Sequence, residues 1–290
     1  MAQDLFGQEI IKDVILRERF LEPPFSVLDT KTASWQNRKR KWISKGIKSE
    51  IGRDSTAIMS GTDDYRPISK KEGYDNKDNY VSIFDPALTE LMYNWFCEEG
   101  GTILDPFAGG SVRGIVANYL GFKYTGLELR QEQVDSNIQQ SLDILPIDNQ
   151  PEYYCGDADR LLDNKFPMFD MIFSCPPYAN LEVYSDLPDD LSNMGYKDFS
   201  FKYHNIIQKA LNLLNPNCYA VFVVGDVRDK NGNYIGFVAD TIKIFQRCGA
   251  KLYNEAILLN VVASASMRAN GNMKTKKLVK IHQNVLVFKK

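Results

Sequence analysis

The sequence predicts an α/β fold in which a mainly parallel β-sheet carries helices on both faces. From residue 101 onward, short apolar runs alternate with longer stretches whose apolar residues recur at helical spacing. Strands that alternate with helices in this way form a parallel sheet with a helix in each crossover. Ligands bind such sheets at the carboxyl ends of the strands. The loops that follow the apolar runs are therefore the candidate binding segments.

Seven strands and four helices are expected between residues 101 and 290. The strands are expected at Thr102–Asp105, Lys123–Glu128, Glu152–Cys155, Phe169–Ser174, Tyr219–Gly225, Lys251–Leu259 and Asn284–Phe288. The helices are expected at Ser111–Leu120, Gln131–Leu142, Phe199–Leu214 and Phe237–Cys248. Asn215-Pro216-Asn217 is expected to end one helix and turn the chain. Because no long helix separates the last two strands, we expect them to pair antiparallel.

The first 80 residues have a different character. Leu5–Leu21 could form a helix, and a basic stretch with Trp35 and Trp42 follows it, then a polar, turn-rich segment from Gly52 to Asn79. We expect residues 1–80 to form an N-terminal arm or small subdomain, and residues 81–290 to form the main domain.

Two basic segments lie on an otherwise acidic chain. Residues 31–53 contain eight basic residues and one acid, and residues 267–290 contain seven basic residues and no acid, whereas the whole chain has a net charge of −2. This asymmetry is typical of a surface that contacts a polyanion, and two solvated surface stretches explain it equally well.

The overall composition indicates an ordinary globular protein. Of 290 residues, 44% are hydrophobic and 25% are charged. No apolar run is long enough to cross a bilayer, and the N-terminus lacks the apolar stretch of a signal peptide. We expect a cytoplasmic protein that does not act at a membrane. The five cysteines show no C-x-x-C spacing and there are only two histidines, so no disulfide framework and no metal site is expected.

The loop after the first strand of the main domain has the character of a ligand-binding turn. It reads Asp105-Pro106-Phe107-Ala108-Gly109-Gly110-Ser111, and its glycines allow a ligand to approach the backbone closely. Glu128 ends the next strand, where a carboxylate could accept the two ribose hydroxyls of an adenosine group. Asp157 follows the third strand and could bind an adenine amino group. Three such features at successive strand ends favour an adenosine-bearing ligand.

The fourth strand runs into a stiff turn, Ser174-Cys175-Pro176-Pro177-Tyr178. Each proline fixes its φ angle and has no N–H to donate, so the carbonyls of the turn can point into a pocket. The amino group of a nucleic-acid base is a poor nucleophile, since its lone pair is delocalised into the ring. Preorganised acceptors on its N–H bonds would free that lone pair. Tyr178 could stack on a base that has been flipped out of its helix.

These motifs resemble those of the S-adenosylmethionine-dependent amino-methyltransferases that act on adenine N6 or cytosine N4 in DNA. Cys175-Pro176-Pro177-Tyr178 is similar to their [D/N/S]-P-P-[Y/F] signature, and Asp105–Gly110 is similar to their cofactor loop. Ser82-Ile83-Phe84-Asp85-Pro86 resembles the segment that closes over the methionine end of the cofactor. The resemblance covers roughly residues 80–290. It implies a seven-stranded Rossmann-like sheet with an antiparallel last strand, and S-adenosylmethionine as cofactor.

The resemblance also implies roles for individual residues. Asp105 and Gly109 would lie near the methionine part of the cofactor, Glu128 at the ribose and Asp157 at the adenine. The full set of expected cofactor-binding residues is Phe84, Asp85, Asp105, Pro106, Phe107, Ala108, Gly109, Gly110, Ser111, Glu128, Leu129, Asp157 and Ala158. The expected catalytic residues, which would hold the target base, are Ser174, Cys175, Pro176, Pro177 and Tyr178.

Cys175 departs from the family pattern, because a thiol is a weak hydrogen-bond partner. Either Cys175 replaces Ser, or Ser174 supplies the acceptor, or the carbonyls suffice. Adenine and cytosine both stay open as target. A cysteine beside a proline could also support methylation of pyrimidine C5, but that chemistry normally has the order Pro-Cys, and the reversed order here disfavours it.

The basic segments supply the expected contacts to nucleic acid. We expect these from Trp35, Arg38, Lys39, Arg40, Lys41, Arg268 and Lys274. Ser264–Lys280 is expected to form a mobile loop over DNA, and the acidic stretch Asn180–Tyr196 a lid or structural loop. DNA is the expected partner. The alternatives are an RNA amino-methyltransferase and a catalytically silent nucleic-acid-binding protein of the same fold.

Overall fold

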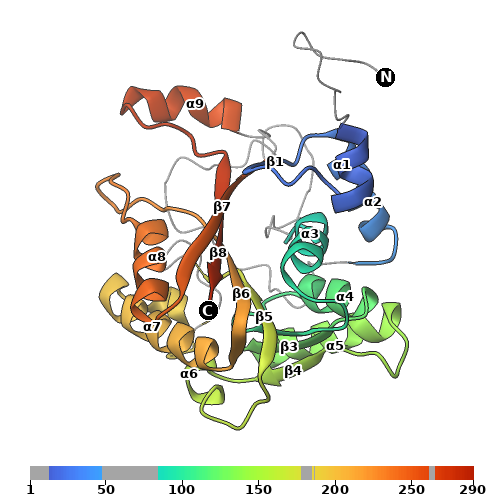
Figure 1. The fold of residues 1–290 in the computed structure, drawn as a ribbon. Helices are drawn as coiled ribbons and strands as arrows, with labels where there is room; N and C mark the ends of the chain where they lie inside the picture. The colour runs from blue at the N-terminus through green and yellow to red at the C-terminus, as the bar shows by residue number, and fades with distance from the viewer. Residues whose placement is uncertain (1–12, 48–83, 178–184, 186, 261–264) are drawn as a thin grey trace, which may run out of the picture.

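The computed structural model describes residues 13–47, 84–177, 185, 187–260 and 265–290. In these ranges eight strands form one sheet, in the order β1-β7-β8-β6-β5-β2-β3-β4 (Figure 1). The strands are β1 (Val27–Asp29), β2 (Thr102–Asp105), β3 (Lys123–Glu128), β4 (Glu152–Cys155), β5 (Phe169–Ser174), β6 (Leu214–Val224), β7 (Lys251–Leu259) and β8 (His282–Lys289). Strand β8 runs antiparallel to both β6 and β7, and the other neighbouring pairs are parallel. The prediction of a mainly parallel sheet with an antiparallel last strand is confirmed.

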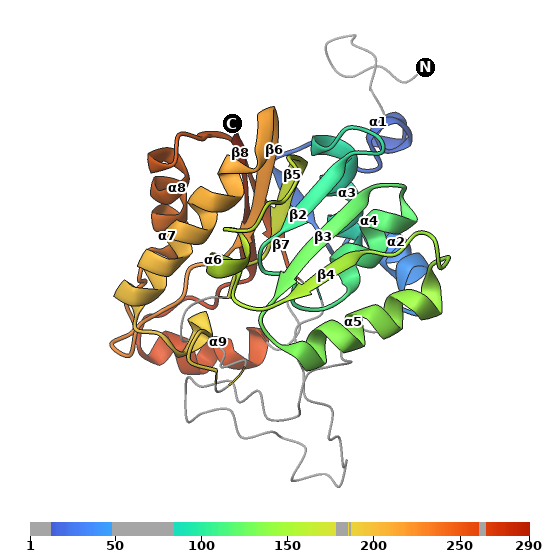
Figure 2. The ribbon, with the colours of Figure 1, turned by 90° about the horizontal axis from the view of Figure 1, so that it is seen from below.

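Helices cover both faces of the sheet (Figures 1 and 2). The helices are α1 (Asp13–Phe20), α2 (Ala33–Ile43), α3 (Pro86–Phe96), α4 (Val112–Tyr119), α5 (Gln131–Ile144), α6 (Ala158–Leu161), α7 (Tyr196–Asn212), α8 (Phe237–Arg247) and α9 (Ala265–Lys274), with the 3-10 helix η3 (Leu191–Asn193). Helices α2, α3 and α4 pack on one face in a cluster that includes Trp42, Leu91 and Ile115. Helices α7 and α8 cover the other face, where Phe199 and Phe245 lie in the second cluster. Burial of both faces explains why the central strands read as continuous apolar runs.

Strand β1 is a feature that the sequence reading missed. Its three residues pair parallel with the end of β7, in the register Val27↔Ile257 to Asp29↔Leu259. Thr30 follows it, and its N–H and hydroxyl both donate to the Leu259 carbonyl, at 3.3 and 2.6 Å. A three-residue strand is too short to show period-two alternation, so only its partner strand defines it.

The described part of the N-terminal segment is joined to the main sheet. Strand β1 belongs to the sheet, and α2 packs on α3, where Trp42 Nε1 donates to Glu90 at 2.7 Å. The expected boundary at residue 80 lies among residues outside the described ranges, so the division into 1–80 and 81–290 stays a prediction.

The predicted helix end at Leu214 and the predicted turn after it both need correction. The helix expected to reach Leu214 ends at Asn212, and β6 begins at Leu214 instead of after a turn. Tertiary contacts hold this early strand: the Asn215 amide donates to Asp170 at 2.8 Å, and Asn217, at φ 64°, donates its N–H to the carbonyl of Lys290.

The loop expected at 264–280 contains helix α9. Residues such as Ala265, Met267 and Arg268 favour helix strongly enough to offset Gly271 within it. Helix α9 follows the carboxyl end of β7 and lies outside both helical layers (Figure 1). Among the helices described, none is long and apolar enough to span a membrane.

Candidate active site

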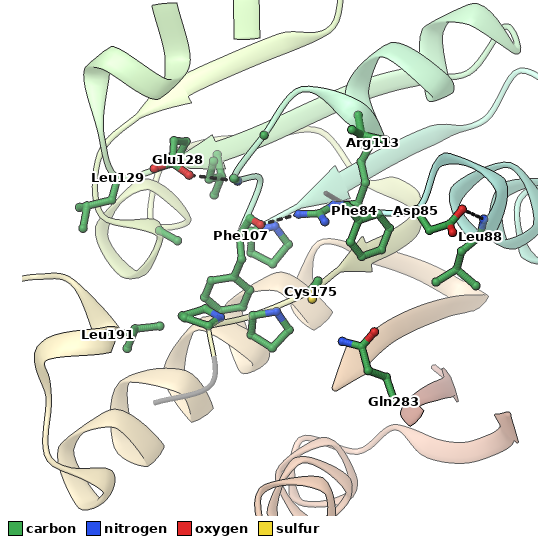
Figure 3. A pocket seen from close by; sticks show the side chains of 18 of the residues that line it. Phe84, Asp85, Leu88, Phe107, Arg113, Glu128, Leu129, Cys175, Leu191 and Gln283 are labelled. Carbon is green, nitrogen blue, oxygen red and sulfur yellow. Dashed lines mark hydrogen bonds between the residues drawn. The ribbon is translucent and has the colours of Figure 1, made fainter. Parts of the chain in front are cut away.

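A cavity of about 540 Å³ lies at the carboxyl edge of the sheet (Figure 3). The loop after β2 and the proline turn after β5 both line it, and so do the ends of β3 and β4. The expected site residues that line it are Phe84, Asp85, Pro106, Phe107, Gly109, Gly110, Glu128, Leu129, Asp157, Ala158, Cys175, Pro176 and Pro177. The structure therefore brings two segments to one cavity: the loop Asp105–Ser111, called the glycine loop below, and the turn Cys175-Pro176-Pro177, called the proline turn. Tyr178 lies outside the described residues.

The glycine loop is held against the end of β3. Gly109 has φ 53°, a conformation that favours glycine, and its N–H donates to the Glu128 carboxylate at 3.0 Å. The Asn137 amide donates to the Gly109 carbonyl at 2.7 Å, which fixes the other side of the same residue. Glu128 also accepts the N–H of Arg130 at 3.0 Å. The loop is thus ordered by side chains of β3 and α5.

Asp105 lies beneath the cavity and does not line it. Its side chain is fully buried, and its carboxylate accepts hydrogen bonds from Arg113 Nε at 2.5 Å, Tyr124 at 2.8 Å and Ser174 at 2.5 Å. The Phe107 N–H adds a fourth donor at 3.1 Å. The expected contact of Asp105 with the methionine part of a cofactor is corrected, because this carboxylate is fully buried and is not among the residues that line the cavity.

Ala108 and Ser111 also lie behind the cavity wall. Ala108 is fully buried, and the Ser111 hydroxyl is 2.7 Å from the Gln140 amide oxygen, to which it donates. Both residues shape the loop from behind, and the expectation of direct cofactor contact is corrected for them as well.

Arg113 is a functional candidate that the sequence reading missed. Its guanidinium donates to the carbonyls of Phe107 and Ala108, at 2.7 and 2.9 Å, and lies over the Phe84 ring at 4.5 Å. Burial acts to lower the pKa of Arg113, but the neighbouring Asp105 carboxylate more than offsets this and raises it. The group therefore stays charged in the floor of the cavity. The sequence signal for Arg113 was a single charged residue in a helix whose other residues are mostly apolar.

The wall beside Phe84 comes from α2 and α3. Asp85 caps α3, since its carboxylate accepts the N–H groups of Ala87 and Leu88, and Pro86 occupies the first helical turn. The other oxygen of Asp85 accepts Trp35 Nε1 at 3.2 Å and lies 3.4 Å from Lys39 Nζ. The cavity wall here carries one acid and one base within ion-pair distance.

At the opposite end, Asp157 caps α6. One of its oxygens accepts the N–H of Asp159 at 3.1 Å, and the other is 3.0 Å from Lys202 Nζ. Lys202 also pairs with Asp189, at 3.2 Å. Asp189 and its neighbours Asp190 and Leu191 line the cavity, so part of the acidic stretch expected as a lid or structural loop does reach the site.

Ser174 does not face the cavity. It is fully buried, and its hydroxyl donates to Asp105. The hypothesis that Ser174 supplies an acceptor to the target base is therefore wrong. Cys175, in contrast, lines the cavity together with both prolines.

The expected nucleic-acid contacts fall into two groups. Trp35 is 1% exposed and belongs to the core, so its expected role in DNA contact is corrected. Arg38 is also engaged within the protein, since it pairs with Glu90 at 2.9 Å and donates to the Leu21 carbonyl. Lys39 lines the cavity. The exposed members of the expected set are Arg40, Lys41, Arg268 and Lys274.

One protein-family model matches part of the chain. Residues 18–139 match the N6/N4 methyltransferase family model, which describes DNA methylases. No curated protein matches the sequence.

Several solved structures are similar to the chain. TrmN from Thermus thermophilus is 16% identical, with a TM-score of 0.47, over 71% of this chain and 49% of that protein. The chain thus spans about half the length of this relative. Magnesium protoporphyrin IX methyltransferase from Synechocystis, solved with S-adenosylmethionine bound, is 12% identical, with a TM-score of 0.39, over 65% of this chain and 68% of that one. A candidate DNA modification methylase, also from Thermus thermophilus, is 20% identical, with a TM-score of 0.34, over 46% of this chain and 50% of that one.

The family match overlaps the segment in which Asp85, the glycine loop and Glu128 build the cavity. Over residues 18–139, less than half of its length, the chain is similar to the DNA methylases that this family model describes.

Proposed function

We propose that the protein transfers a methyl group from S-adenosylmethionine to the exocyclic amino group of a flipped-out DNA base, at adenine N6 or cytosine N4. The observation that carries this proposal is the single cavity shared by the glycine loop and the Cys175-Pro176-Pro177 turn. A methyl donor and a base can meet only if both bind in the same space.

The residues of the cavity fit the cofactor. Its volume of about 540 Å³ is in the range of small-molecule sites. Glu128 and Asp157 would accept hydrogen bonds from the ribose and the adenine, and the Gly109–Gly110 backbone allows close approach. The Asp85–Lys39 pair offers opposite charges for the ammonium and carboxylate of the methionine part. When bound, the cofactor supplies an electrophilic methyl group on a sulfonium that becomes neutral as the methyl leaves.

The proline turn would hold the base. Because Ser174 is committed to Asp105, the acceptors for the amino group must come from the carbonyls of the turn or from another wall of the cavity. The turn is fixed in place through Ser174 and is stiffened by two prolines, which suits preorganised acceptors. Catalysis here needs orientation of the amino nitrogen more than a strong base.

The exposed basic residues would bind the phosphates. Arg40 and Lys41 lie on α2, and Arg268 and Lys274 lie on α9. Helix α2 also contributes Lys39 to the cavity wall, and α9 is attached to the two strands that carry Leu258 and Gln283 into the same cavity. Both basic helices thus adjoin the site where a base would enter.

Mass spectrometry of nucleosides tests this proposal. DNA and RNA from cells that express the chain should be compared with DNA and RNA from cells that do not. We expect new N6-methyladenine or N4-methylcytosine in DNA. A new peak in RNA alone would favour the RNA alternative, and 5-methylcytosine would favour attack by Cys175. Cofactor binding without methyl transfer to either polymer would indicate a silent binding protein.

A further inference from the structure

The proline turn lacks a strong side-chain acceptor at the positions where related enzymes carry one. The resembling enzymes usually have Asp, Asn or Ser before the prolines, whereas this chain has Cys175. The preceding Ser174 donates its hydroxyl to Asp105 at 2.5 Å and is fully buried. Of the two side chains before the prolines, only a thiol therefore faces the cavity, and a thiol is a weak hydrogen-bond partner. A base amino group needs another acceptor.

An amide on the opposite wall can supply it. Gln283, near the start of β8, lines the same cavity as Cys175, Pro176 and Pro177. Figure 3 shows its side chain extending from β8 toward Cys175. The sequence reading did not consider this residue, because a glutamine at the edge of a strand carries no motif.

Alternation along β8 places Gln283 on the correct face of the sheet. Val285 and Val287 lie in the core cluster under α3 and α4, and Leu286 and Phe288 lie in the cluster on the other face. Side chains two positions apart in a strand share a face, so Gln283 shares the face of Val285. Cys175 and Phe84 pack against that same cluster.

Strand register places Gln283 level with the proline turn. Ser174 on β5 pairs with Phe222 on β6, and Phe222 pairs with Leu286 on β8. Gln283 is three residues from Leu286 in the direction that leads past the end of β5, so it stands across from the prolines. Two strand spacings separate β5 from β8, or about 10 Å. Strand β6 lies between them, so a base would lie over β6 on the face that Cys175 and Gln283 share, with the turn on one side and the amide on the other.

We propose that Gln283 binds the edge of the target base that carries the amino group, a proposal that rests on the function proposed above. The amide oxygen accepts one amino N–H, and the amide nitrogen donates to the adjacent ring nitrogen, N1 of adenine or N3 of cytosine. Both bases present this donor and acceptor side by side, so one amide recognises either. The accepted N–H also draws the amino lone pair out of the ring, which is the task of the missing acceptor before the prolines.

Three variants test the assignment in the full-length protein. Gln283→Met keeps the length of the side chain and removes both polar groups, and Gln283→Glu keeps the acceptor and removes the donor. Gln139→Met is the control, because Gln139 is exposed on α5 and bonds Asp143 on the same helix. The substrate is genomic DNA from a host without base methylation. We expect kcat/KM to fall about 10-fold or more in both Gln283 variants, the loss typical of a bidentate base contact, and to stay unchanged in the control.

Two further readouts separate base contact from a structural role. The dissociation constant for S-adenosylmethionine, from calorimetry, and the melting temperature should stay at wild-type values in Gln283→Glu. A duplex carrying 1-deazaadenine or 3-deazacytosine at the methylated position lacks the ring nitrogen. For the wild type, this duplex should lower kcat/KM as much as the Gln283→Glu substitution does with normal DNA. For Gln283→Met, it should cause no further loss of kcat/KM.

The outcomes are distinguishable. A wild-type protein that methylates DNA while both Gln283 variants keep full kcat/KM overturns the assignment of Gln283 and leaves the proposed function intact. A wild-type protein that binds the cofactor but methylates no nucleic acid overturns both proposals.

Discussion

Asp105 connects the two loops that form the site. Its carboxylate binds Arg113 under the glycine loop and Ser174 at the end of β5, and all three side chains are buried. The sequence indicated that the acid at the end of β2 belongs to the site, but its actual partners lie 8 and 69 positions away along the chain. No spacing rule links such positions, so the role of Asp105 as an internal tie could not be predicted.

Replacement of Ser174 separates a structural role from a catalytic one. In Ser174→Ala, Asp105 loses one donor and keeps Arg113, Tyr124 and the Phe107 N–H. We expect the free energy of unfolding to fall by about 1–2 kcal/mol, the usual effect of a lost buried hydrogen bond, with kcat within a few-fold of wild type. Denaturant unfolding and steady-state kinetics measure the two quantities. Ser136→Ala, which removes a hydroxyl bonded only to its own helix, is the control. A loss of kcat above 100-fold at unchanged stability would restore Ser174 as an acceptor.

Removing one partner of the buried Asp105–Arg113 ion pair should lower the stability of the fold strongly. In Asp105→Asn the buried guanidinium keeps its charge without a counterion, so we expect stability to fall by about 3 kcal/mol or more. In the double variant Asp105→Asn/Arg113→Met both charges are gone. We expect the double variant to lose less stability than the sum of the two single variants, as measured by urea unfolding. Simple additivity would mean that the two side chains do not act as a pair.

At the scale of elements, α2 shows what periodicity could and could not reveal. Trp35 and Trp42 are seven residues apart, so they lie on one face of a helix, and both are buried against α3. That spacing was a usable signal for a core-facing stripe, with Arg40 and Lys41 on the solvent side. The sequence did not show what the stripe packs against, because Asp85 and Glu90, the partners of the two indoles, lie about fifty residues later.

Asp170 joins three strands and should make their stability depend on pH. It accepts the N–H and the hydroxyl of Thr102 on β2, each at 2.9 Å, and the amide of Asn215 on β6 at 2.8 Å. Burial acts to raise the pKa of Asp170, but these donors more than offset it and hold the pKa below its ordinary value of 3.8. A lowered pKa means that the stabilisation is fully present above 3.8 and is lost as the pH falls through the lowered value.

Asp170→Asn should therefore be less stable than wild type near neutral pH, and the difference should shrink as the pH falls below 3.8. Urea unfolding at a series of pH values measures this. The control is Asp148→Asn, since Asp148 is exposed in the loop after α5 and its removal should leave the curve parallel to wild type. A constant difference between Asp170→Asn and wild type across the whole pH series would contradict the role given to the carboxylate.

At the scale of the whole molecule, the sequence predicted the sheet but not its margins. Strands β2, β3 and β5 were predicted with their bounds, because both their faces are largely buried. The glycine loop, the acids and the prolines all lie at strand ends. The three-residue β1 was missed because only its pairing with β7 defines it, and the helix α9 was missed because its segment is rich in small residues. The cavity wall opposite the proline turn, with Leu258 and Gln283, comes from β7 and from the start of β8, which lies just before the predicted strand.

The position of α9 leads to a prediction about DNA binding. This helix joins the carboxyl end of β7 to β8, so it stands on the edge of the sheet that carries the cavity, and within it only Ala265 is buried. A helix with exposed Arg268 and Lys274 and no acid is suited to phosphate contact. The opposite edge offers a matched control, because Lys123 and Lys251 are exposed at the amino ends of β3 and β7.

Neutralising α9 should weaken DNA binding through loss of phosphate contacts alone. Each such contact releases counterions and contributes about 0.9 to the slope of log K against log salt concentration. We expect Arg268→Ala/Lys274→Ala to reduce the magnitude of that slope by about 2, measured by fluorescence anisotropy with a labelled duplex over a salt series. The dissociation constant for S-adenosylmethionine should not change, because neither residue lines the cavity. Lys123→Ala/Lys251→Ala removes the same charge from the far edge and should leave the slope as it is. If both pairs reduced the slope equally, net charge and not the position of α9 would govern the approach of DNA to the site.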